Sequence, residues 1–191
     1  RIPAGAGMGG GSSDAATTLM GLNALWNLHL SCSELMTLGT KLGADVPFFL
    51  LGTNAWVEGI GEKLTPIDLP AMQFDIIWPG ISQSTVEIFS HPLLTRDTKS
   101  VKMSVFNGQR SAQDWMNMGH NDLEAVVRLV SPEVDALLKQ VPQYRLTGSG
   151  SAVFRVVNSK SDWVKDAFHE KWQHFSVKSL KIHPTLSALS C

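Results

Sequence analysis

The sequence has few cysteines and few charges, and neither is arranged as a metal centre or a nucleic-acid surface would require. Its two cysteines, Cys32 and Cys191, match no metal-binding or redox spacing. Charged residues make up 17% of the chain, and 16 basic against 17 acidic side chains give a net charge of −1. Because proteins that bind the phosphate backbone of nucleic acids are usually clearly basic, we expect no nucleic-acid partner.

The chain also lacks a long hydrophobic run. No apolar stretch reaches the roughly twenty residues needed to span a bilayer, which favours a soluble cytoplasmic protein with no membrane partner. Hydrophobic residues nevertheless make up 43% of the 191 residues, enough for a substantial core in one large domain or two small ones. The sequence leaves the oligomeric state open.

Glycine, in contrast, is unusually dense near the start. Five of the seven residues from Gly5 to Gly11 are glycine, which indicates positive φ angles or a close approach of the backbone to a ligand. Apolar residues then recur at helical spacing: Ala15, Ala16, Leu19, Met20, Leu22 and Trp26. A glycine segment that leads into a helix offers free N–H groups to a phosphate, with Ser12 and Ser13 as further donors or as the N-cap.

Other interpretations of the glycine segment stay open. No lysine follows the glycines, which excludes a Walker-type phosphate loop. The spacing Gly5-x-Gly7-x-x-Gly10 does satisfy the fingerprint of an NAD-binding oxidoreductase, for which Glu34 is the only acid near the required distance. The remaining interpretation is a flexible glycine turn without a ligand.

An aspartate stands at the edge of a strongly apolar segment. Asp45 precedes Val46-Pro47-Phe48-Phe49-Leu50-Leu51, and Pro47 biases Val46 toward an extended conformation. Asp45 is either a solvated helix cap or loop acid, or a carboxylate positioned beside the phosphate segment. In the second role it would act as a base or orient a hydroxyl group.

The remaining residues predict helices and strands without a regular strand–helix–strand repeat, which is typical of the α+β class. Helices are expected at 14–28, 84–89, 112–118, from 121, at 132–140 and at 162–172, and strands at 54–58, 72–78, 152–157 and 175–182, with a loop at 95–108. A further helix is expected between a cap at Ser31 or Ser33 and a C-terminal Gly43. Prolines 66 and 70 indicate a domain boundary, which gives domains at 1–70 and 71–185 and a frayed tail at 186–191.

Two further motifs lie in the second half of the chain. Asn121 is a good N-cap, and Glu124 three residues later completes a variant of the capping box. Gly148-Ser149-Gly150-Ser151 precedes the strand at 152–157. Taken alone, this second glycine motif predicts either a tight turn or part of a functional site.

In their order along the chain, these motifs resemble the GHMP kinase superfamily. Residues 3–16 are similar to its central ATP-binding motif, and residues 146–154 are similar to its third, glycine-rich motif. Three further segments resemble the branch whose substrate is 4-diphosphocytidyl-2-C-methyl-D-erythritol, in non-mevalonate isoprenoid synthesis: 43–49, 58–62 and 121–124. The resemblance extends from residue 2 to about residue 157.

The resemblance implies a kinase that uses Mg²⁺ and ATP to phosphorylate the 2-hydroxyl of the methylerythritol moiety. It implies two domains, of which the first is incomplete and similar to the second domain of a small-subunit ribosomal protein, and the second is ferredoxin-like. Asp45 would be the catalytic aspartate, and Gly148, Ser149 and Gly150 would lie at the substrate and the transferred phosphate. The first motif would bind the triphosphate through Pro3, Ala4, Gly5, Ala6, Gly7, Met8, Gly9, Gly10, Gly11, Ser12 and Ser13. The metal ligands stay open.

The resemblance also predicts what the printed chain lacks. The family's first motif, with a lysine that partners the aspartate, and the residues that hold the cytosine are expected upstream of Arg1. We therefore expect this chain to be a piece of a longer protein and to be inactive by itself. The alternatives are another GHMP kinase (homoserine, galactose or mevalonate type), an NAD-binding oxidoreductase and a non-catalytic binding module.

Overall fold

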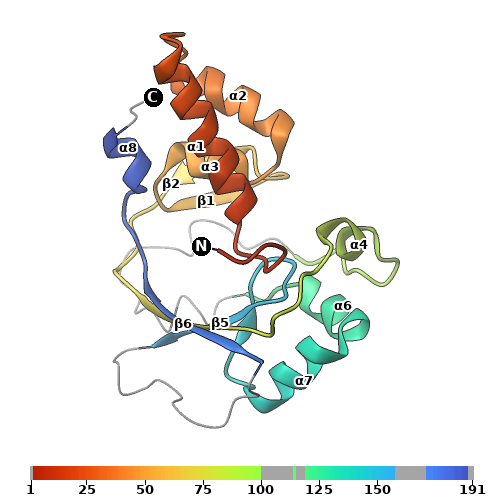
Figure 1. Cartoon of the computed structure of the whole chain (residues 1–191). Helices are drawn as coiled ribbons and strands as arrows, with labels where there is room; N and C mark the ends of the chain where they lie inside the picture. Colours follow the sequence, from red (N-terminus) through yellow and green to blue (C-terminus); the bar gives the residue numbers. More distant parts are fainter. Residues whose placement is uncertain (1, 100–113, 115–118, 158–170, 189–191) are drawn as a thin grey trace. The chain divides into compact units, whose positions relative to one another are not determined.

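The computed structural model describes residues 2–99, 114, 119–157 and 171–188 (Figure 1). The chain divides into two compact units. Unit 1 comprises Arg1–Met8 and Pro70–Ser179, and unit 2 comprises Gly9–Leu69 and Leu180–Cys191. Both helices and strands are present, so the predicted α+β class is confirmed. None of the described helices combines the length and the hydropathy that a bilayer crossing needs.

Unit 2 consists of helices, which share an apolar core, and a two-stranded hairpin (Figure 1). Its elements are α1 (Gly10–Leu25), α2 (Cys32–Leu42), α3 (Val46–Leu51), β1 (Ala55–Glu58), β2 (Lys63–Pro66) and α8 (Pro184–Ala188). Strands β1 and β2 pair antiparallel as a hairpin. The buried core comes from the first three helices: Ala16, Met20, Leu35, Val46 and Leu50. This core fixes the starts of α1 and α3 within one unit.

The local signals predicted for α2 are confirmed. The Ser31 hydroxyl accepts from the N–H of Glu34, and the Glu34 carboxylate accepts from the N–H of Ser31 at 2.8 Å, which completes a capping box. Gly43 ends the helix as the C-cap. Both ends of α2 are therefore specified by residues within the helix or directly next to it.

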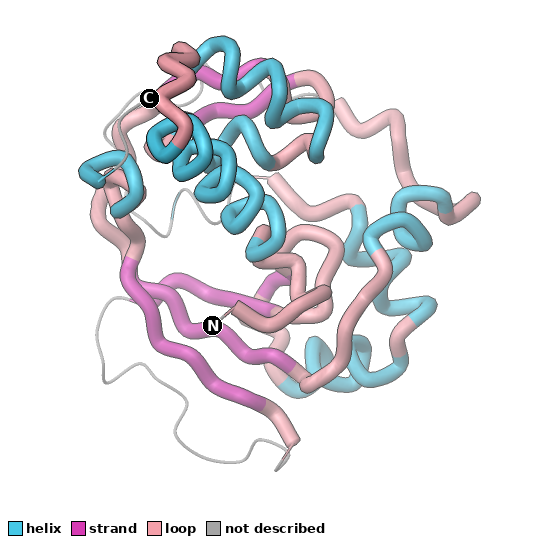
Figure 2. Tube along the Cα trace, turned by 45° about the horizontal axis from the view of Figure 1, so that its top comes forward, coloured by secondary structure: helices cyan, strands magenta, loops and turns pink. Residues whose placement is uncertain are grey.

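Unit 1 is built on a sheet of four antiparallel strands, which lie side by side in Figure 2. In spatial order these are β4 (Arg145–Leu146), β5 (Val153–Val157), β3 (Gln73–Trp78) and β6 (Gln173–Lys178). The helices of this unit are α4 (Thr85–Ser90), α6 (Leu123–Val130) and α7 (Pro132–Gln140). Strand and helix side chains share one buried core: Ile77, Ile88, Val126, Val127, Val134, Leu137, Leu138, Val141, Tyr144, Leu146 and Val153.

Several predicted boundaries differ from the structure. Helix α1 begins at Gly10 and ends at Leu25, four residues earlier than predicted at its start, and β2 has no counterpart in the prediction. The tail is not frayed over its described part, because α8 places Leu186 against the core of unit 2. Apart from Asp114, Lys171 and Trp172, the helices predicted at 112–118 and 162–172 lie outside the described residues, as does most of the loop at 95–108.

The compact units also differ from the predicted domains at both ends of the chain. Residues 1–8 belong to unit 1 because their backbone pairs with the second glycine motif, as described below. Residues 180–191 belong to unit 2, where the N–H of His183 donates to the carbonyl of Gly52 at 2.7 Å. The chain passes from unit 2 to unit 1 between Leu69 and Pro70.

Candidate active site

Helix α1 starts inside the first glycine motif and has no side-chain cap. Its N-cap is Gly9, which has a φ of 68°, a left-handed conformation that glycine adopts readily. The N–H of Ser13 donates to the carbonyl of Gly9 at 2.9 Å, so the N–H groups of Gly10, Gly11 and Ser12 have no acceptor within the helix. The prediction that Ser12 or Ser13 caps the helix is wrong, because both lie in its first turn.

Two glycines of this motif differ in what surrounds them. A Cβ atom on Gly9 would lie 2.9 Å from the Cζ atom of Phe49, on α3, so packing as well as the φ angle favours glycine here. A Cβ atom on Gly11 would have no heavy atom of the described chain within 4 Å. Packing within the described part of the chain therefore gives no reason for glycine at position 11.

The first half of the glycine motif belongs to unit 1, where it pairs with the second glycine motif. The carbonyl of Gly7 accepts from the Thr147 hydroxyl at 2.8 Å, and the carbonyl of Ala6 accepts from the N–H of Ala152 at 3.1 Å. A Cβ atom on Gly7 would lie 2.1 Å from the carbonyl oxygen of Thr147, a separation that no side chain tolerates. The structure thus brings together two motifs that lie about 140 residues apart in the sequence.

The second glycine motif forms a turn whose conformation requires glycine twice. Gly148 has a φ of 51° and Gly150 a φ of 79°, and the N–H of Gly150 donates to the carbonyl of Thr147 at 2.9 Å. The hydroxyl of Ser149, in the turn, forms a hydrogen bond with the hydroxyl of Thr85, at the start of α4, at 2.8 Å. The predicted tight turn is therefore present.

Asn121 contacts this turn and Glu124 contacts the strand before it, and neither contact was predicted from the sequence. The N-cap of α6 is Asp122, so the prediction that Asn121 is the N-cap is wrong by one residue. The Asn121 side chain accepts from the N–H of Leu123 at 3.0 Å, and its amide donates to the carbonyl of Gly148 at 2.8 Å. Glu124 does not complete a capping box; it accepts from the N–H of Leu146 at 3.2 Å instead. The capping-box prediction for α6 is wrong because the backbone N–H of Leu146, in β4, binds the Glu124 carboxylate instead.

Asp45 occupies the N-cap position of α3, with an exposed side chain that makes no cap hydrogen bond. The prediction of an extended Val46 is wrong, since α3 begins at this residue and tolerates Pro47 in its first turn. Both residues are buried and anchor the backbone beside the aspartate. The hairpin turn lies against the same backbone, because a Cβ atom on Gly61 would be 2.5 Å from the carbonyl oxygen of Ala44.

The acid that the dinucleotide interpretation requires is already engaged. The Glu34 carboxylate bonds both the hydroxyl and the N–H of Ser31, at 2.7 and 2.8 Å. The hydroxyl contact, together with the bond from the Ser31 backbone, holds the pKa of Glu34 below its usual range. This carboxylate serves the capping box of α2, so the interpretation as an NAD-binding oxidoreductase loses its ribose-binding acid.

The part of the chain that the structure describes contains no group of three or more His, Cys, Asp or Glu side chains placed to hold a metal ion. Mg²⁺ commonly keeps several waters and takes only one or two protein ligands beside the phosphates of a nucleotide. A metal that arrives with a nucleotide therefore needs no such group. In the first glycine motif, Ser12 and Ser13 offer hydroxyl ligands.

Comparison with known proteins gives this geometry a family context. The family model described as "GHMP kinases N terminal domain" matches residues 1–53, which include the first glycine motif and Asp45. A crystal structure of 4-(cytidine 5'-diphospho)-2C-methyl-D-erythritol kinase matches 84% of this chain and 60% of that protein, with a TM-score of 0.63 and 33% sequence identity. The likeness includes both sequence and fold.

Curated relatives match over nearly the whole chain. The chain is 45% identical to a 4-diphosphocytidyl-2-C-methyl-D-erythritol kinase of Janthinobacterium sp. (strain Marseille), over 96% of this chain and 64% of the relative. It is 44% identical to the kinase of the same name from Burkholderia cenocepacia (strain HI2424), over 99% of this chain and 67% of the relative. The chain thus spans about two thirds of the length of the curated relatives it matches.

Proposed function

Because the chain belongs to the 4-diphosphocytidyl-2-C-methyl-D-erythritol kinase family of the GHMP kinases, we propose that it carries the phosphate-binding and catalytic parts of such an enzyme. The reaction would transfer the terminal phosphoryl group of ATP to the 2-hydroxyl of 4-diphosphocytidyl-2-C-methyl-D-erythritol and release ADP. Unit 1, an antiparallel four-stranded sheet with packed helices, would be the ferredoxin-like domain. Unit 2 would be the remainder of the ATP-binding domain.

The observation that carries the proposal is the uncapped start of α1. Three N–H groups have no acceptor within the helix, and a Cβ atom on Gly11, among them, would meet no heavy atom of the described chain within 4 Å. The positive end of the helix dipole adds to these donors, and together they favour a phosphate group at this position. A side chain at the N-cap would use one of the donors, which gives a chemical reason for glycine at the cap.

In the proposed reaction the substrate oxygen attacks the terminal phosphorus, a phosphorus–oxygen bond forms, and the bond to the ADP oxygen breaks. Asp45 would accept the proton that leaves the attacking hydroxyl. Such transfers need positioning and charge neutralisation more than covalent chemistry from the protein. Mg²⁺, when bound with ATP, would supply part of that neutralisation, and the backbone of Gly148–Gly150 would supply a fixed surface near the transferred group.

The proposal is tested by phosphorylation of the named substrate. The chain is joined to those parts of the Burkholderia cenocepacia relative that it does not cover, and this completed chain is assayed for ADP release with ATP and 4-diphosphocytidyl-2-C-methyl-D-erythritol. We expect turnover that requires both substrates. ADP release at the same rate without the second substrate, or no release at all from a folded completed chain, would overturn the proposal.

A matched pair of substitutions in α1 tests the phosphate site. Gly11 and Gly21 both lie in α1, and a Cβ atom at either position meets no heavy atom of the described chain within 4 Å. Alanine at either position therefore keeps or slightly raises stability, by up to about 1 kcal/mol. We expect Gly11→Ala to raise the KM for ATP at least about tenfold, since its methyl group occupies space beside the donors, and Gly21→Ala to leave it unchanged. Equal KM values for ATP in the two variants would remove the phosphate site from α1.

A further inference from the structure

The second glycine motif follows directly on β4, the edge strand of the sheet in unit 1. In the pairing of β4 with β5, Leu146 stands opposite Val153, and the N–H of the next residue, Thr147, donates to the carbonyl of Ala152. Hydrogen-bonded and non-bonded pairs alternate in an antiparallel ladder. The N–H and carbonyl of Leu146 therefore point away from β5, toward the open edge of the sheet.

Two side chains from the start of α6 occupy that edge in place of a further strand. The Glu124 carboxylate accepts from the N–H of Leu146 at 3.2 Å, and the Asn121 amide donates to the carbonyl of Leu146 at 3.1 Å. The same amide donates to the carbonyl of Gly148 at 2.8 Å. We name these two side chains the α6 bracket. It satisfies backbone groups that are costly to leave unpaired when partly buried.

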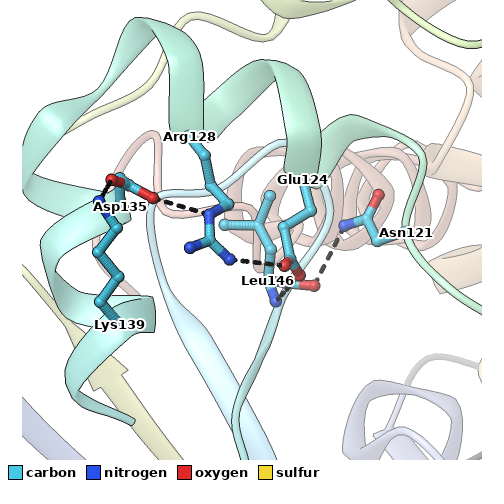
Figure 3. Close-up of polar contacts among 6 residues, drawn as sticks. All are labelled: Asn121, Glu124, Arg128, Asp135, Lys139 and Leu146. Carbon is cyan, nitrogen blue, oxygen red and sulfur yellow. Dashed lines mark hydrogen bonds and ion pairs between the residues drawn. The ribbon is translucent and has the colours of Figure 1, made fainter. Parts of the chain in front are cut away.

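Ion pairs tie the α6 bracket to α7, as Figure 3 shows. Arg128 lies 3.7 Å from the Glu124 carboxylate and donates to Asp135 at 2.8 Å, and Lys139 lies 2.7 Å from the other oxygen of Asp135. The Lys139 ammonium and the Arg128 guanidinium hold the pKa of Asp135 below its usual range. Arg128 thus holds Glu124 at the carboxylate oxygen that does not bond Leu146.

The turn that the bracket holds has little freedom to move without displacing the first glycine motif. A Cβ atom on Gly148 would lie 2.9 Å from the carbonyl oxygen of Gly7, and Thr147 bonds the same oxygen through its hydroxyl. The contact is between two backbones, so a shift of the turn is transmitted to residues 5–7. The bracket therefore sets the position of both glycine motifs within unit 1.

We infer that Asn121 and Glu124 are positioning residues for the phosphoryl-transfer reaction, acting through the turn of Gly148–Gly150. The inference rests on the proposed function, in which this turn lies at the transferred phosphate. Asn121 carries the larger effect, because its amide bonds the two carbonyls on either side of Thr147. Glu124 fixes the strand that precedes the turn.

The test replaces the donors of Asn121 while keeping its size. Asn121→Asp retains an oxygen that can accept from Leu123, and its added negative charge near the start of α6 favours the helix. It removes both donors to Leu146 and Gly148. We expect hydrogen exchange of the amides in 147–152 and 5–7 to accelerate about tenfold or more, measured on the printed chain. In the completed chain we expect kcat to fall about 10- to 100-fold, while the KM for ATP changes by less than about threefold.

Ser31→Ala is the control, since it removes a helix cap of α2 that contacts no glycine motif. It should lower the melting temperature without changing exchange at 147–152 or kcat. Asn121→Ser, which lacks the new charge, repeats the test if Asn121→Asp does not fold. Unchanged exchange in both Asn121 variants would overturn the positioning role, and faster exchange with normal kcat would overturn its link to the reaction. An inactive unsubstituted completed chain would instead overturn the kinase proposal, and the exchange measurement would still decide the role of Asn121.

Discussion

Two aspartates, each beside a run of apolar residues, have opposite surroundings in the structure. Asp75 lies in the middle of β3 with a side chain only 2% exposed, and it is bonded by the Tyr144 hydroxyl at 2.5 Å. Arg155 and His174 lie 3.6 and 3.7 Å from its oxygens. Asp45 is exposed at the start of α3 and makes no cap hydrogen bond.

The difference separates a carboxylate that holds the fold from one that is available for chemistry. A buried carboxylate is costly unless hydrogen bonds and opposite charges compensate for lost hydration, and Asp75 has both. The Asp45 carboxylate stays in solvent, so the fold does not depend on its charge, and its oxygens are open to a substrate. The backbone beside Asp45 is nevertheless fixed by the buried Val46 and Pro47, which is what a proton acceptor needs.

The sharpest test of the comparison is Asp45→Asn in the completed chain. Asparagine keeps the size and one acceptor oxygen but cannot take the proton of the attacking hydroxyl. We expect kcat to fall about 10²- to 10⁴-fold, or roughly 3–5 kcal/mol in barrier. The melting temperature should not change, because no cap hydrogen bond is lost. Normal turnover together with a lower melting temperature would make Asp45 a structural cap and would end its catalytic assignment.

The counterpart is Asp75→Asn, for which the expected effects are reversed. The substitution removes the charge that faces Arg155 and places amide hydrogens near a guanidinium group in a buried site. We expect the free energy of unfolding to fall by about 1–3 kcal/mol. The rate per folded molecule should stay the same. Denaturant titration gives the first quantity, and kcat normalised to the folded fraction gives the second; a loss of kcat with normal stability would contradict the comparison.

The sequence predicted those parts of the structure whose partners are near in the chain. Helix α2 has its cap and its C-terminal glycine within one stretch, and β3 and β5 were placed to within one residue by their apolar residues. The role of the acid in β3 was not predicted, because the pattern of a strand does not show that Asp75 bonds Tyr144, 69 residues away. A local pattern cannot specify a partner at that distance.

The candidate site shows the same limit. The glycine motifs were found by composition, but their contact through Thr147 and Gly7 joins residues 140 positions apart. Glu124 was interpreted as a capping residue since Asn121 lies three positions before it, and the structure gives it a partner 22 positions later. The roles of Asp45 and of the glycine motifs in catalysis stay predictions.

The smallest expected effect concerns Tyr144 and sharpens the account of Asp75. Burial, followed by the hydrogen bond to Asp75 and the charge of that carboxylate, raises the pKa of Tyr144 above its ordinary value near 10. The folded state then keeps the phenolic proton at a pH where the unfolded chain releases it. The corresponding stability is therefore fully present below about pH 10 and is lost as the pH rises above it.

Tyr144 is the single tyrosine of the chain, so the ultraviolet absorbance of tyrosinate reports on this side chain alone. In the folded protein we expect the tyrosinate signal to appear only at a pH where unfolding begins. In denaturant we expect it to appear at about pH 10. Tyr144→Phe should remove the corresponding part of the alkaline stability loss, and the difference between the two stability curves cancels the titration of the lysines. Tyrosinate that forms near its ordinary pKa in the folded protein would show that Asp75 is not shielded from solvent by Tyr144, and the contrast with Asp45 would then rest on Arg155 and His174 alone.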